Sequence, residues 1–160
     1  MIKDSKKLLL SLVVISSILL LSWSSNPPQR STGAPGEGTC GKSGCHSSGT
    51  TINGTLTMAG LSTIIEPDSL YPITFKISAI SGKPQRAGIQ VTALDEQNVF
   101  AGDFSNPGIN STVSSAVGRM YFEHQPAQFF SDSTEIIYTV DWTSPEIATD
   151  SITFYIAAVL

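Results

Sequence analysis

Four segments of this 160-residue chain alternate apolar and polar residues with a period of two, which is typical of strands with one buried face. The clearest segment places Tyr71, Phe75 and Ala79 on one face and polar residues such as Lys76 on the other. The other three segments have their apolar residues at 89–93, 136–142 and 152–158. Because no helical period of useful length follows residue 24, the alternation predicts an all-β protein.

Shorter candidate strands lie at 51–59, 99–104 and 118–124, and turn-rich breaks at 81–84, 105–108 and 143–146 separate the segments. About seven short strands predict an antiparallel, immunoglobulin-like β-sandwich over residues 51–160. A true immunoglobulin domain is excluded, because both cysteines lie in one loop before the first strand instead of bridging two sheets. Trp142 is expected in the core, where its indole N–H needs a partner.

Residues 1–24 have the layout of a secretory signal peptide, with Lys3, Lys6 and Lys7 before an apolar run at 8–21 and small residues at Ser22 and Ser24. The run is about 14 residues, shorter than the roughly 20 that span a bilayer. An uncleaved N-terminal anchor is the alternative. Export predicts a periplasmic, cell-surface or extracellular protein, and it places the cysteines in an oxidising compartment.

The segment 25–50 is rich in glycine and proline, which predicts an extended leader in front of the sandwich. Removing residues 1–24 takes away three lysines and one aspartate, leaving six basic against twelve acidic residues, a net charge of about −6. Such a charge argues against nucleic acid as a partner.

Five stretches together resemble the choice-of-anchor V domains of exported bacterial proteins, which are related to the reelin N-terminal (Reeler) type. They are GAPGEGTC with GCHS at 33–47, AGIQVTAL at 87–94, YFEH at 121–124, VDWTSP at 140–145 and ITFYIAA at 152–158. The resemblance implies a β-sandwich at the bacterial cell surface or in the periplasm, without a defined activity. In that family an anchoring segment often follows the domain, so we expect the chain to be truncated at its C-terminus.

The candidate ligand or cofactor-binding residues Cys40, Cys45 and His46 lie close together in a CxxxxCH motif. A c-type haem uses two thiols and a histidine directly after the second one, usually as C-x-x-C-H. Here four residues separate the cysteines, so the loop is wider. Two of the four are glycines, which give the loop freedom to fold back. His46 and His124 would be the two axial ligands of the iron, with Met120 or Met58 as substitutes for the second.

Two other interpretations of the motif remain open. Cys40 and Cys45 could form a disulfide, which requires their Cα atoms to lie within about 7 Å. Zinc could instead be held by Cys40, Cys45, His46 and His124, the only cysteines and histidines of the chain. If His124 binds neither haem iron nor zinc, it is an ordinary strand histidine with a hydrogen-bond partner.

The expected function is therefore that of an exported haem c protein, engaged in electron transfer or redox sensing at the bacterial envelope. The alternative is a secreted adhesion module with a Cys40–Cys45 disulfide. No serine beside a base and no paired carboxylates suggest an enzyme. Expected partners are a redox protein or a cell-surface component, with membrane contact only through an uncleaved signal or a missing C-terminal anchor.

Overall fold

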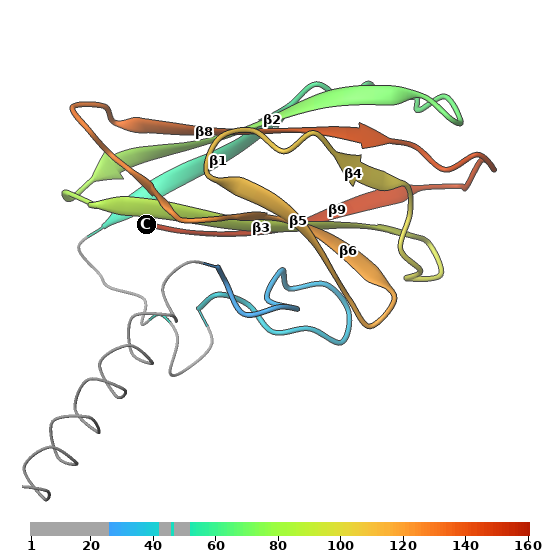
Figure 1. The fold of residues 1–160 in the computed structure, drawn as a ribbon, viewed down its shortest axis with the longest axis horizontal. Helices are drawn as coiled ribbons and strands as arrows, with labels where there is room; N and C mark the ends of the chain where they lie inside the picture. Colours follow the sequence, from blue (N-terminus) through green and yellow to red (C-terminus); the bar gives the residue numbers. More distant parts are fainter. Residues whose placement is uncertain (1–25, 42–45, 47–51) are drawn as a thin grey trace, which may run out of the picture.

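The protein is an antiparallel β-sandwich, as predicted, in a computed structural model that describes residues 26–41, 46 and 52–160. The described residues contain nine strands and no helix (Figure 1). One sheet has the order β1 (Asn53–Ala59), β2 (Leu70–Ser81), β8 (Glu135–Thr143), β4 (Asp103–Ser105). The second sheet has the order β5 (Ser111–Ala116), β6 (Arg119–His124), β3 (Arg86–Asp95), with β7 (Gln128–Phe129) and β9 (Ile152–Val159) also paired to β3.

The core between the sheets is built from the apolar faces that the alternation predicts. Phe75 of β2 is fully buried, and its ring lies 5.7 Å from that of Phe122 on β6 in the facing sheet. Trp142 is also fully buried, which confirms the expectation for this residue. Its indole N–H donates to the carbonyl of Ala101 at 3.1 Å, so the buried donor is satisfied.

Strand β3 is buried on both faces, which matters for the site described below. Ile89 and Val91 point into the core, and Gln90 and Thr92, on the opposite face, are buried as well. The segment 26–41 covers this outer face, on the side of the β3–β9 layer that lies away from β2 and β8 (Figure 1). Residues 26–41 therefore form a partial third layer on the second sheet.

Two strands, β5 and β7, were not predicted. Strand β5 has the sequence STVSSA, which lacks apolar alternation, and it is held by six register pairs with β6. Strand β7 is only two residues long. The strand expected at 99–104 is shifted, because β4 begins at Asp103 and Phe100 forms only an isolated bridge with Leu94. Whether such short strands form depends on pairing with a neighbouring strand more than on the local sequence pattern.

The predicted signal peptide, residues 1–24, lies outside the described residues. Within the part of the chain that is described, we find no helix with the length and apolar character that crossing a membrane requires.

Candidate functional site

Residues 30–39, called the leader hairpin below, form a compact turn directly before Cys40. The Gly33 amide donates to the Gly38 carbonyl at 2.8 Å, and the Gly38 amide donates to the Arg30 carbonyl at 3.1 Å. Gly33 and Gly36 have φ angles of 81° and 80°, a conformation that glycine adopts without strain. The leader has no helix or sheet strand among its described residues, but it is folded rather than extended.

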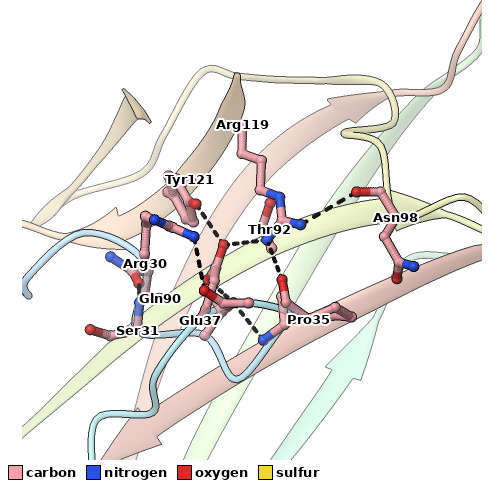
Figure 2. A network of polar contacts seen from close by, with 12 residues as sticks. Arg30, Ser31, Pro35, Glu37, Gln90, Thr92, Asn98, Arg119 and Tyr121 are labelled. Carbon is pink, nitrogen blue, oxygen red and sulfur yellow. Dashed lines mark hydrogen bonds and ion pairs between the residues drawn. The ribbon is translucent and has the colours of Figure 1, made fainter. Parts of the chain in front are cut away.

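Glu37 is the principal link between the leader hairpin and the sheet (Figure 2). Its side chain is fully buried, and one carboxylate oxygen accepts from the Arg119 guanidinium at 2.6 Å and from the Tyr121 hydroxyl at 2.7 Å. The other oxygen accepts from the Thr32 hydroxyl at 2.6 Å. The carboxylate is thus neutralised by Arg119 of β6, and both of its oxygens are hydrogen-bonded.

The electrostatics of Glu37 follow from these contacts. Burial alone would raise the pKa of its carboxyl, but the hydrogen bonds from Thr32, Tyr121 and Arg119, together with the Arg119 charge, lower that pKa below its usual value. Burial and the bond to Glu37 in turn raise the pKa of Tyr121 to about 12. At neutral pH the carboxylate is therefore charged and the phenol is protonated, the states that their hydrogen bond requires.

Gln90 of β3 forms a second link to the leader. Its side-chain carbonyl accepts from the Ser31 amide at 2.7 Å, and its side-chain NH₂ donates to the Pro28 carbonyl at 3.2 Å and to the Glu123 carboxylate at 2.8 Å. Gln90 and Glu123 are almost completely buried. One amide side chain thus connects the leader, β3 and β6 through three hydrogen bonds.

His124 lies at the end of β6, where the β3–β6 ladder stops after the Gln90–Glu123 pair. Its Nδ1 lies 3.0 Å from the Ile89 amide and 3.1 Å from the Ile89 carbonyl. A Cβ atom on Gly88 would come within 2.5 Å of the His124 ring, so the imidazole occupies the space that any other residue at 88 would need. The ring is therefore fixed by the main chain of β3.

Burial is the main cause that lowers the pKa of His124, and the positive charge of His46 lowers it further, whereas the bond to Ile89 acts in the opposite direction. His46, which is described although its neighbours in sequence are not, is exposed to solvent. A positive charge on its ring lowers the pKa of His124. The fold thus brings the two histidines, 78 positions apart in sequence, within electrostatic range of each other.

The other predicted site residues are placed as follows. Cys40 is half-buried, and its thiol lies 3.5 Å from the Ser31 carbonyl, whereas Cys45 lies outside the described residues. Met120 is partly buried against the core and Met58 lies on β1 of the opposite sheet. Among residues 26–41, 46 and 52–160, no three or more His, Cys, Asp or Glu side chains are grouped to hold a metal ion.

The contacts of His124 are compatible with ligation of a haem iron in one of the two tautomers of its ring. Binding iron through Nε2 requires the proton to reside on Nδ1, and the Ile89 carbonyl at 3.1 Å is in place to accept it. The alternative tautomer accepts from the Ile89 amide instead. Either tautomer keeps the ring in one orientation, with Nε2 directed away from that bond.

Several residues of this site were not predicted: Gly88, Gln90, Glu37 and Arg119. Gln90 and Glu123 face each other on β3 and β6. Each is a polar residue inside a stretch that resembles a family motif, and this is the sequence signal that could have indicated a buried polar contact. Glu37, three positions before Cys40, shows no such pattern, because its two partners on β6 lie more than 80 residues away.

Comparisons with known proteins give similarity to solved structures only, since no family model and no curated protein matches the chain. A crystal structure of the human F-spondin reeler domain (fragment 2) has a TM-score of 0.48 and 20% identity, covering 67% of this chain and 78% of that one. Fragment 1 of the same human domain gives 0.46 and 22%, covering 66% and 74%. The Reelin-N domain of F-spondin gives 0.47 and 23%, covering 66% and 71%.

Proposed function

We propose that this chain is an exported redox protein that carries one covalent haem c on Cys40 and Cys45, with His46 and His124 as axial ligands. The observation that supports this most directly is the seating of His124. Its ring packs on Gly88, its Nδ1 is bonded to the Ile89 main chain, and the charge of His46 reaches it.

A bound haem would supply one-electron chemistry at its iron, and two imidazole ligands favour a low-spin, electron-transferring centre. The chain's own residues would do the rest. The leader hairpin fixes the position of Cys40, and the buried outer face of β3 excludes water on one side. Ile89 holds the His124 ring in one orientation, and ligation would need the tautomer in which Nδ1–H donates to the Ile89 carbonyl.

The resemblance to choice-of-anchor V domains supports export to the bacterial envelope, where haem is attached covalently. In this setting the chain passes electrons to or from a redox partner protein, or senses redox state at the cell surface. It is not an enzyme in the narrow sense. A methionine in place of His124 as the second ligand would raise the reduction potential.

The proposal is tested by visible spectra of the full chain expressed in a host with haem-maturation machinery and exported. We expect a low-spin c-type spectrum that persists after denaturation. Cys45→Ser should weaken or abolish attachment, and His124→Ala should leave a coloured but high-spin protein. Met58→Leu, on the opposite sheet, is the matched control and should leave the spectrum unchanged.

Two results would contradict the proposal. A colourless wild-type protein with a Cys40–Cys45 disulfide would favour the adhesion module. A low-spin spectrum that survives His124→Ala but is lost in Met120→Leu would assign the second ligand to methionine instead.

A further inference from the structure

A groove of about 700 Å³, called the end groove below, lies where the β1–β2 loop (60–69) and the β8–β9 loop (144–151) meet at one end of the sandwich. Clefts of this volume are typical of ligand sites. Met58, Ile64 and Ile147 line it and are 39%, 72% and 80% exposed, so their apolar side chains face solvent. Phe154 also lines it, and its ring packs on that of Trp142 at 5.1 Å. The end groove therefore leads from an exposed apolar rim to the core.

The two loops are tied to each other by hydrogen bonds that centre on the buried Ser144. Its hydroxyl donates to the Glu66 carbonyl at 2.6 Å and accepts from the Ser69 amide at 2.9 Å. The Ser144 amide donates to the Ser69 carbonyl at 3.0 Å. The Asp68 amide donates to the Pro145 carbonyl, also at 3.0 Å. Because these bonds fix both loops, a ligand would bind without first having to order them.

The charge around the end groove has one sign. All ionisable side chains of the two loops are acidic, and they belong to Glu66, Asp68, Glu146 and Asp150. All four residues are exposed, and Asp150 lines the groove itself. Strands β1 and β9, which border the groove, contain no charged residue. Charge complementarity therefore favours a partner with basic groups beside its apolar ones.

Strand β9 has a free edge at this groove. It lines the groove with Ile152, Thr153 and Phe154, and among the described strands it is paired with β3 alone. Its other edge therefore presents main-chain N–H and C=O groups to which an added strand can bond. The sequence of β9, ITFYIAAV, contains no proline and no charged residue, the usual features that prevent such pairing. An extended polypeptide can use this edge, whereas other cationic and apolar ligands cannot.

We propose that the end groove binds an extended segment of a partner protein in which lysine or arginine flanks alternating apolar residues. The main chain of that segment adds to the free edge of β9 as a further strand. Its apolar side chains contact Ile64 and Ile147, and its basic side chains lie against the acidic rim at Glu146 and Asp150. This interaction does not depend on the proposed haem function, and its test requires no haem.

The proposal is tested by selecting random heptapeptides, displayed on phage, on the exported and processed chain. The Ile64→Ala, Ile147→Ala double variant serves as the counter-selection bait, and it should keep the fold because both side chains are exposed. We expect the enriched peptides to carry alternating apolar residues with lysine or arginine at one or both ends. Absence of enrichment on wild type over the double variant would overturn the proposal, and so would enrichment of acidic peptides.

The role of the acidic rim is tested with an enriched peptide, made synthetically with a fluorescent label, whose affinity is measured by anisotropy. Asp150→Asn should weaken binding by about two- to fivefold, the range expected for one exposed charge pair, and the loss should shrink as the salt concentration rises. Asp132→Asn, the same change at an exposed aspartate outside the groove, is the matched control and should leave the affinity unchanged. Equal affinities of wild type and Asp150→Asn would overturn the role of the rim.

The pairing with β9 is tested with two N-methylated forms of the same peptide, one methylated at odd positions and the other at even positions. In an extended strand, the N–H groups that bond to one neighbouring strand come from alternate residues. One form should therefore lose at least about tenfold in affinity, and the other should stay within about twofold of the parent peptide. Equal tolerance or equal loss of both forms would overturn the proposal, because the peptide would then bind without adding a strand.

Discussion

Gly88 is the single residue on which the orientation of His124 depends most directly. Its neighbours Ala87 and Ile89 point into the core, so its own position faces outward, under the imidazole. Gly88→Ala would force a methyl group to within 2.5 Å of the ring. We expect a loss of about 1–3 kcal/mol in the free energy of unfolding, measured by urea denaturation.

For the urea measurement on the protein without haem, the matched control is Gly41→Ala, where a new Cβ would meet nothing closer than 3.9 Å. In the haem-loaded protein, Gly88→Ala should also lose the low-spin spectrum. If Gly88→Ala were as stable and as low-spin as wild type, the tight seating of the ring would be refuted.

Glu37 should make leader docking depend on pH. Its pKa is lower in the folded protein than in the unfolded chain, so the stabilisation is complete above the ordinary carboxyl pKa of about 4.5 and is lost as the pH falls through the lower folded value. The charged and titratable groups around it are Arg119, Tyr121 and Arg30. Tryptic sites are unsuitable at such pH, so hydrogen exchange of the Gly33 amide, corrected for its intrinsic pH dependence, is the measurement.

In wild type we expect the protection of this amide to fall in acid, at pH values below the ordinary carboxyl pKa of 4.5. In Glu37→Gln, protection should be low at every pH and lack that step. A wild-type profile without a step in the acid range would contradict the assignment of leader docking to the ionised Glu37 carboxylate.

Between elements, the Gln90–Glu123 contact ties β3 to β6 in a region with only two register pairs. Gln90→Leu would leave a buried carboxylate without its donor and would also release Ser31. We expect it to cost roughly 2–4 kcal/mol of unfolding free energy. Gln90→Leu combined with Glu123→Leu should be less destabilised than Gln90→Leu alone, because the uncompensated carboxylate is gone.

A double-mutant cycle in urea provides the measurement, with a coupling energy of about 1 kcal/mol or more as the expected result. Additive effects of the two substitutions would show that Gln90 stabilises the fold mainly through its contacts with the leader and not through its bond to Glu123. Thr139→Ala, on the exposed face of β8, is a suitable surface control.

The elements that sequence analysis predicted best are those with one buried and one exposed face. In β8, buried and exposed residues alternate along most of the strand, so period and structure agree. Strand β3 is buried on both faces, so its polar residues Gln90 and Thr92 look solvent-exposed in sequence but are not. The leader hairpin was missed for the same reason: its contacts are long-range, and its glycine-rich sequence resembles that of an unstructured linker.

At the scale of the whole molecule, the two sheets should unfold together, because their aromatic side chains form one core. Phe122 contacts both Phe75 of β2 and Phe104 of β4 in the facing sheet. Phe122→Ala should lower the free energy of unfolding by about 3–5 kcal/mol, with near- and far-ultraviolet circular dichroism changing in one transition. Ile147→Ala, at a side chain 80% exposed, should change it by less than about 0.5 kcal/mol.

Separate transitions for the two sheets in Phe122→Ala would contradict a single core. The same experiment distinguishes core from leader, since Glu37→Gln should increase local exchange in the hairpin far more than it shifts the global transition.

Sequence alone suggested Cys40, Cys45 and His46 as candidate site residues, because they form a local motif, and their role stays a prediction. His124 was predicted from its strand pattern, and its low pKa and contact with Ile89 give it a defined environment. Gly88 and Arg119 could not be predicted, since their importance arises from partners brought together only by the β3–β6 pairing. Whether Cys45 carries haem stays a prediction, because this residue lies outside the described ones.

The most direct test of the haem assignment is the intact mass of the exported, denatured protein, produced in a host with haem-maturation machinery. We predict the mass of the processed chain plus one haem, retained under denaturing conditions and lost in the Cys40→Ser, Cys45→Ser double variant. A mass two hydrogens below that of the processed chain, with no added haem, would mean a Cys40–Cys45 disulfide and would contradict the account.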